Sequence, residues 1–248
     1  MIEVKNLSFS YKNKKILSDI SFSLKEGECC ALLGKNGSGK TTLLRLLSKL
    51  QSADSGELCL NGKPYSSYSP REFSKNVSYF AQTRNTPQMS VYDYVSYGRY
   101  PHSGISFRLS ASDKEAIERA LEKTNTQDFR YRELASLSGG ERHLVYLARL
   151  LAQNAPHLLL DEPTSFADAQ NGFLIADILR SECREKKAIL AVTHDLPLAL
   201  ASFDRVLVLS ENSLIADTDP KTAVNVGAVE RAYGVRCEKV ERGYVLFK

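Results

Sequence analysis

Residues 34–42, GKNGSGKTT, combine glycines, a lysine and two threonines in a spacing that suits phosphate binding. Gly34 to Thr41 fit the pattern G-x-x-x-x-G-K-[ST], with a strand pattern before them and a helical pattern after them. Glycines let backbone N–H groups turn inward around a phosphate, and the start of the helix adds its positive dipole. We expect Lys40 to meet β- and γ-phosphate oxygens and Thr41 to ligate Mg²⁺; the alternative is an ordinary glycine turn. The predicted nucleotide-binding residues of this loop are Gly34, Asn36, Gly37, Ser38, Gly39, Lys40, Thr41 and Thr42.

A pair of carboxylates, Asp161 and Glu162, directly follows the apolar run in LLLDEPTS, residues 158–165. A strand over this run would hold Asp161 near the mouth of a sheet, where it can bind Mg²⁺ directly or through water. Glu162 is then placed to polarise an attacking water as a general base. An acidic pair at a strand end can also be a solvated loop or a helix cap. The phosphate loop upstream favours the metal interpretation.

A second glycine pair stands about a hundred residues downstream of the first, in LSGGERH, residues 137–143. Ser138, Gly139 and Gly140 open a predicted helix, so their free N–H groups and the helix dipole form another anion site. The chain nevertheless has one Lys40 and one acidic pair, which is enough for a single hydrolytic centre.

The elements around these motifs are those of an α/β protein. The first 24 residues alternate like antiparallel strands, and CCALLG, residues 29–34, is typical of a buried strand. Leu43, Leu46, Leu47 and Leu50 form the stripe of one helix. The remaining predicted strands are a hairpin arm at 56–63 with an Asn-Gly turn and the segments 77–82, 157–161, 188–194 and 205–210. Helices are predicted from 139 and near 169–185, and a short helix between the last two of these strands. A small helix and a closing strand are predicted at the C-terminus.

The composition changes over residues 83–136, which are Tyr-rich and polar and include a predicted helix with a capping box from Ser112 to Glu115. We interpret this region as an α-helical insert. The predicted organisation is one domain over 1–248. Its core covers about 1–82 and 157–248 and its helical insert about 83–156.

Bulk composition excludes several classes of protein. The chain has 248 residues, 43% of them hydrophobic, and a net charge of +4 from scattered Lys and Arg. Dispersed charge of this kind favours a solvated surface, so no nucleic-acid partner is expected. Five cysteines without a CxxC spacing favour reduced thiols in a cytosol. No apolar run reaches the roughly 18 residues of a spanning helix, and the N-terminus reads as a strand instead of a signal peptide.

The order of the motifs resembles the nucleotide-binding subunit of an ABC transporter. The phosphate loop, Gln82 after a strand, LSGGE, LLLDEP and His194 after a strand follow one another over nearly the whole chain. The resemblance implies an ABC-type P-loop ATPase fold with an N-terminal antiparallel β subdomain and the helical insert. The string GRYPH at 98–102 further resembles the importers of iron-siderophore, haem and cobalamin substrates, although one short string carries this finer assignment.

The resemblance assigns roles to residues that spacing alone does not. Tyr11 would stack on adenine, with a plain strand aromatic as the alternative. Gln82 would contact Mg²⁺ or the lytic water and link the site to the insert. His194 would touch the γ-phosphate and the region of Glu162. Without the resemblance, each of these residues would be interpreted as an ordinary structural residue.

The resemblance also answers why a second anion site exists. Two copies would pack head to tail, so that Ser138, Gly139 and Gly140 of each bind the γ-phosphate of the ATP on the other, with Asp168 at the subunit contact. The implied partners are ATP with Mg²⁺, a second copy, two membrane-spanning permease subunits and, through them, an extracytoplasmic binding protein. The chain would then work at the cytoplasmic face of the membrane.

Four residues at three places depart from the usual pattern of the family. His143 and Leu144 replace a commoner Gln-Arg pair, Ala167 replaces a leucine, and Lys35 stands where proline is frequent. None removes a group that does chemistry, but Ala167 puts the strength of the dimer contact in question. The alternatives are an ABC ATPase that imports or exports another small molecule, a soluble ABC-type ATPase acting on DNA or ribosomes, a P-loop kinase or GTPase, and a non-catalytic binding module.

Overall fold

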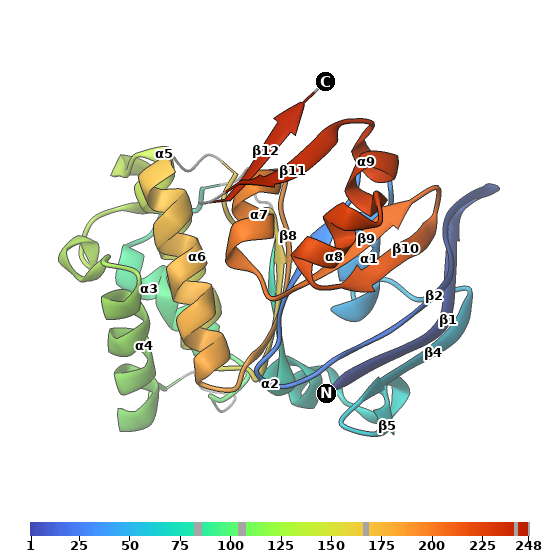
Figure 1. The fold of residues 1–248 in the computed structure, drawn as a ribbon. Coiled ribbons are helices and arrows are strands. Elements are labelled where there is room, and N and C mark those ends of the chain that lie inside the picture. Colours follow the sequence, from blue (N-terminus) through green and yellow to red (C-terminus); the bar gives the residue numbers. More distant parts are fainter. Residues whose placement is uncertain (82–85, 104–107, 166–168, 241–242, 248) are drawn as a thin grey trace.

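A six-stranded, mostly parallel sheet forms the centre of the molecule, as the computed structural model in Figure 1 shows. The structure describes residues 1–81, 86–103, 108–165, 169–240 and 243–247. The strand order is β10-β9-β3-β8-β7-β6, with β10 antiparallel to its neighbour β9. These strands are β3 (Cys29–Leu33), β6 (Val77–Phe80), β7 (His157–Asp161), β8 (Ala188–Val192), β9 (Arg205–Ser210) and β10 (Ser213–Thr218).

Both faces of this sheet are covered, which explains its continuous apolar strands. All five residues of β3 are buried, and they alternate between two cores. Cys29, Ala31 and Leu33 pack on the helical side, whereas Cys30 and Leu32 pack toward the β subdomain. All five cysteines are free thiols in the structure.

A four-stranded antiparallel sheet lies over one face, in the order β2-β1-β4-β5. Its strands, and the helix that packs beneath them, are β1 (Ile2–Tyr11), β2 (Lys14–Leu24), β4 (Ser55–Leu60), β5 (Lys63–Pro64) and α1 (Lys40–Leu47). Asn61 and Gly62 have φ angles of 51° and 75° in the tight β4–β5 turn, as the Asn-Gly pair predicts. The predicted helical stripe is wrong at Leu50, which is 66% exposed because α1 has already ended and Lys49 has a φ of 60°.

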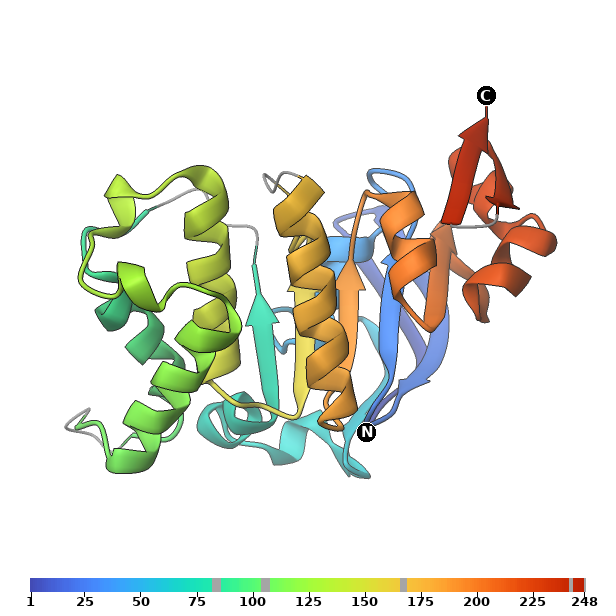
Figure 2. The ribbon, with the colours of Figure 1, turned by 60° about the vertical axis from the view of Figure 1, so that its left-hand side comes forward.

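Helices cover the opposite face and extend beyond the β6 edge of the sheet, where Figure 2 shows the insert helices side by side. They are α3 (Val91–Ser96), α4 (Ala111–Lys123), α5 (Gly139–Ala152) and α6 (Ala169–Arg184), whereas α2 (Pro70–Asn76) packs its buried Phe73 into the core on the β-subdomain side. The capping box of α4 is formed by Ser110 and Asp113, so the predicted box at Ser112 and Glu115 is wrong by two residues. The Ser110 hydroxyl accepts the Asp113 N–H at 3.2 Å, which leaves Ser112 inside the first turn.

The C-terminal elements lie at the other end of the sheet from the insert (Figure 2). They are α7 (Leu196–Ser202), α8 (Pro220–Asn225), α9 (Ala228–Tyr233), β11 (Arg236–Val240) and β12 (Gly243–Phe247). After β10, two short helices and a hairpin stand where one small helix and one closing strand were predicted. Within the described ranges, no helix is long and apolar enough to span a membrane.

Candidate nucleotide site

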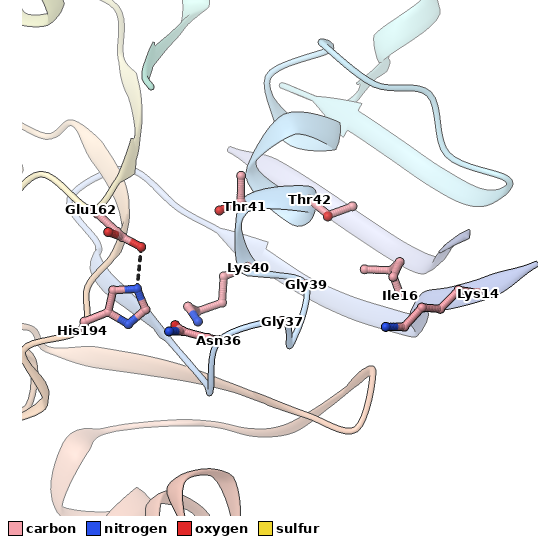
Figure 3. A pocket seen from close by; sticks show the side chains of 10 residues that line it. All are labelled: Lys14, Ile16, Asn36, Gly37, Gly39, Lys40, Thr41, Thr42, Glu162 and His194. Carbon is pink, nitrogen blue, oxygen red and sulfur yellow. Dashed lines mark hydrogen bonds and ion pairs between the residues drawn. The ribbon is translucent and has the colours of Figure 1, made fainter. Parts of the chain in front are cut away.

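A cavity of about 630 Å³ opens beside the phosphate loop, where the first β-hairpin, α1 and the ends of β7 and β8 meet (Figure 3). Its lining consists of Lys14, Ile16, Asn36, Gly37, Gly39, Lys40, Thr41, Thr42, Glu162 and His194. β3, β7 and β8 are neighbouring parallel strands, so the residues that follow them meet at one edge of the sheet. This topology brings the phosphate loop to Glu162 and His194.

Glycine is required at two corners of the phosphate loop. Gly34 has a φ of 150°, and a Cβ built there would lie 2.5 Å from the Leu209 carbonyl oxygen. Gly39 caps α1 with a φ of 100°, and a Cβ there would lie 2.8 Å from Leu17 Cδ2. These approaches let the loop curl tightly against the sheet before α1 begins.

Lys40 folds back into the curve of this loop, as Figure 3 shows. Its Nζ donates to the carbonyl oxygens of Gly34 at 2.6 Å and Lys35 at 2.9 Å. The side chain is buried, and burial lowers the pKa of the ammonium, while Glu162 and Asp161 act in the opposite direction. A cation is thereby held at the point where the loop can receive an anion.

The Thr41 hydroxyl donates to Asp161 Oδ1 at 3.2 Å, and the Tyr79 hydroxyl lies 3.5 Å from Asp161 Oδ2. Asp161 is buried, and burial raises the pKa of its carboxyl against the bond from Thr41. A buried carboxylate beside a hydroxyl is a set of hard oxygen donors, which fits Mg²⁺. Gln82, the other predicted metal contact, lies outside the described residues.

Glu162 and His194 are brought together as the resemblance implies. Glu162 follows β7 with a left-handed φ of 55°, and its backbone N–H donates to the Val192 carbonyl at 3.0 Å. Its Oε1 contacts His194 Nε2, as the dashed line in Figure 3 marks. The carboxylate side chain is 20% exposed and the imidazole 43%, so both remain open to the cavity.

Ser138, Gly139 and Gly140, which we call the signature, form the N-terminus of a helix and lie apart from this cavity. Ser138 caps α5, with its hydroxyl accepting the Glu141 N–H at 3.3 Å and its own N–H donating to the Glu141 carboxylate at 2.8 Å. A Cβ on Gly139 would meet nothing within 4 Å, and one on Gly140 would lie 2.9 Å from Asn171 Nδ2. The described lining of the cavity includes none of these residues.

The first hairpin contributes two residues to the lining that no motif predicted, while Tyr11 stays a prediction. Tyr11 is 43% exposed, packs edge-on against Phe9 at 4.8 Å, and is not among the described residues of the lining. Lys14, its partner across the hairpin, and Ile16 line the cavity instead. No motif marks these two residues, because their role depends on how the hairpin sits over α1. Asp168 and Ala167 lie outside the described residues.

Of the other departures from the family pattern, His143 replaces a usual Gln with an aromatic packing group. Its ring lies 5.0 Å from that of Phe80, centroid to centroid, and burial lowers the pKa of the imidazole. Leu144 is buried in the core beside it. Lys35 supplies the carbonyl that receives Lys40, a role that any residue at this position could fill.

The GRYPH string packs against the C-terminal end of α5. A Cβ on Gly98 would lie 2.4 Å from the Arg149 carbonyl oxygen, so only glycine fits this crossing. Arg99 is buried, with Nε donating to Asp113 at 2.8 Å and Nη1 to the Ala152 carbonyl at 2.7 Å. His102 Nε2 lies 2.9 Å from the Gln153 carbonyl oxygen. These residues therefore serve packing within the insert.

The sequence matches the ABC transporter family over residues 17–165. It is 33% identical to the ferric enterobactin transport ATP-binding protein FepC of Escherichia coli (strain K12), over 93% of this chain and 86% of that protein. It is 31% identical to the probable siderophore transport ATP-binding protein YusV of Bacillus subtilis (strain 168), over 96% and 87% of the two chains. The chain belongs to the ABC transporter family and is an ATPase of that family.

Solved structures show the same fold. The dimeric ABC transporter cassette MJ0796 superposes with a TM-score of 0.78 at 24% identity, covering 89% of this chain and 99% of that one. An inward-facing ABC transporter of proposed metal-chelate type superposes with a TM-score of 0.83 at 24% identity, covering 99% and 95%. The predicted fold class is confirmed.

Proposed function

We propose that this chain is the ATP-hydrolysing subunit of an importer for iron-siderophore or related metal-chelate substrates. The assignment of the ATPase site rests on one observation: the phosphate loop, Glu162 and His194 line the same cavity. The cargo proposal rests on relatives named for ferric enterobactin and siderophore transport, which align over more than nine-tenths of the chain. Haem and cobalamin are alternative cargoes. GRYPH does not favour one of them, because its described contacts are internal.

In the proposed site, each residue has a task set by its position. Lys40 leaves the loop carbonyls to neutralise β- and γ-phosphate charge, and the loop N–H groups hold the phosphates. Glu162 acts as the general base for the attacking water, and His194 orients that carboxylate. Thr41 and Asp161 would hold Mg²⁺, which supplies charge neutralisation between the phosphates when it is bound. We keep Tyr11 as a proposed adenine contact and Gln82 as a proposed link to the insert.

The same proposal makes the working unit a head-to-tail dimer, with Ser138, Gly139 and Gly140 facing the partner's γ-phosphate and Asp168 at the contact. The position of these residues supports it. Ser138 and Gly139 are exposed at the N-terminus of α5, where the first backbone N–H groups of a helix and its dipole can receive an anion.

A mixed-chain experiment tests the dimer. Lys40→Ala disables the phosphate loop and Ser138→Arg disables the signature, so each homodimer should be inactive. A random mixture forms about half heterodimers with one intact site each, so about a quarter of wild-type ATPase activity should return. No recovery, with heterodimers shown by differential tags, would refute the arrangement.

A transport experiment tests the cargo and the remaining partners. We propose two permease subunits, an extracytoplasmic binding protein and attachment to the cytoplasmic face of the membrane. Affinity purification of the tagged chain from solubilised membranes should recover a permease. Uptake of a labelled ferric siderophore should depend on Lys40 in cells that carry the system. Recovery of the permease without any Lys40-dependent uptake of ferric chelates would overturn the cargo and leave the ATPase intact.

A further inference from the structure

A tyrosine from the C-terminal part of the chain contacts the first residue of the phosphate loop. The Gly34 backbone N–H donates to the Tyr233 hydroxyl oxygen at 2.7 Å, across 199 residues of sequence. Tyr233 is the last residue of α9, and the α9 side chains of Val229 and Ala232 are buried in the main core. The hydroxyl is therefore held in place by the packing of α9 against the core.

The Gly34 N–H has little opportunity to find another acceptor. Gly34 follows Leu33, at which β3 and its ladder of hydrogen bonds end. A Cβ on Gly34 would lie 2.5 Å from the Leu209 carbonyl oxygen and 2.6 Å from Ser38 Oγ, so the backbone is enclosed on this side. A buried N–H without an acceptor is destabilised by the full loss of its hydration. Tyr233 removes that penalty in the conformation observed here.

Gly34 also links Tyr233 to Lys40. Lys40 Nζ donates to the Gly34 carbonyl at 2.6 Å, while Tyr233 accepts from the Gly34 N–H. The Lys35 ammonium also lies near the residue after α9, since a Cβ built on Gly234 would be 3.5 Å from it. The end of α9 therefore flanks the loop at Gly34 and Lys35, the two residues whose carbonyls hold Lys40.

We propose that Tyr233 is a positioning residue of the ATP site, which fixes the start of the phosphate loop in its binding-competent conformation. The proposal deepens the proposed function and rests on the assignment of residues 34–42 as the ATP-binding loop. Tyr233 acts through Gly34 and does not touch the reacting atoms. Loss of the hydroxyl should lower the fraction of competent chains, and apparent ATP affinity falls in proportion to that fraction.

Tyr233→Phe tests this, with Tyr68→Phe as the matched control. The Tyr68 hydroxyl donates to the Leu60 carbonyl at 2.7 Å, so each variant loses one hydrogen bond between a tyrosine hydroxyl and the backbone. For Tyr233→Phe we expect the Kd and KM for ATP to rise about tenfold, equivalent to about 1.4 kcal/mol, with kcat within about twofold of wild type. Tyr68→Phe should bind ATP like wild type at a comparable loss of melting temperature.

Wild-type values of Kd and KM in Tyr233→Phe would overturn the proposal. If the variant fails to fold, exchange of the Gly34 amide in the wild-type chain, followed by NMR with ¹⁵N-glycine, decides instead. We expect this amide to exchange far more slowly than that of Gly37, around which a Cβ would meet nothing within 4 Å. Equal exchange rates would refute the contact. Absence of ATP binding to the wild-type chain would instead refute the loop assignment itself.

Discussion

One substitution at Ser138 separates its structural role from its proposed role in ATP hydrolysis. Ser138→Asp keeps a capping oxygen, because aspartate caps helices about as well as serine does. It also introduces a carboxylate where the partner's γ-phosphate is proposed to bind. Ser110→Asp is the matched control, since Ser110 caps α4 in the same capping box, with Asp113 in the place that Glu141 has in α5.

The magnitude follows from the local geometry and from Coulomb's law. Because both caps are kept, both variants should melt within the roughly 1 kcal/mol that a lost cap would cost. A carboxylate about 4 Å from one phosphate charge is repelled by about 4 kcal/mol at an effective dielectric constant near 20. That energy corresponds to about a thousandfold weaker association of the signature with ATP.

The assay compares ATP turnover, ATP binding and melting temperature for the two variants. Ser138→Asp should lose at least about a hundredfold in kcat/KM, while the isolated chain binds ATP normally, because the described lining of the cavity excludes Ser138. Ser110→Asp should retain wild-type turnover. Wild-type turnover in Ser138→Asp would refute the reasoning, since no tight phosphate contact could tolerate the added charge.

Two further predictions concern stability. His157 is fully buried at the start of β7, and burial lowers the pKa of its imidazole to about 4, below its ordinary 6.5. Between about pH 4 and 6.5 the His157 imidazole binds a proton in the unfolded chain but not in the folded one. The free energy of unfolding should therefore be highest above about pH 6.5 and fall by up to about 3 kcal/mol as the pH drops toward 4. His157→Gln should flatten that window in urea titrations at several pH values, and an unchanged slope would contradict it. Gly98→Ala should lower the free energy of unfolding by about 1–3 kcal/mol, because its Cβ would overlap the Arg149 carbonyl at 2.4 Å. Gly139→Ala is the control, since a Cβ there would meet nothing within 4 Å. Equal melting temperatures of the two variants would exclude this packing role of Gly98.

The five parallel strands of the central sheet could be predicted because each carries a local signal, whereas the antiparallel edge strand β10 was not predicted. An apolar run such as 158–160 ends in charged residues, and the carboxyl ends of neighbouring parallel strands share one edge. The juxtaposition of Glu162 with His194, which the resemblance implied, agrees with that rule, as does the approach of Asp161 to Thr41. Local rules failed where two candidates competed, as at Ser110 and Ser112, because pairing with a carboxylate three residues later selects the cap.

Other parts of the site had no local signal. Tyr233 reaches Gly34 only because α9 packs beside β9, and nothing in AYGV marks a contact with a loop 199 residues away. Lys14 and Ile16 line the cavity because the hairpin lies over α1. Leu50 satisfied the helical period yet lies beyond the end of the helix. These outcomes depend on tertiary placement, which periodicity does not encode.

The way the insert is fastened bears on how the signature could meet a partner. Several polar contacts between insert and core lie at the end of α5 remote from Ser138. Lys123 of α4 pairs with buried Glu182 of α6 at 2.5 Å, and Gln153 donates to the Val77 carbonyl at 3.0 Å. The 14 residues of α5 span about 21 Å. A rotation of about 10° at the fastened end would therefore move Ser138 by about 4 Å, more than the length of a hydrogen bond. A movement of this size would be sufficient to make or break the phosphate contact that we propose in trans.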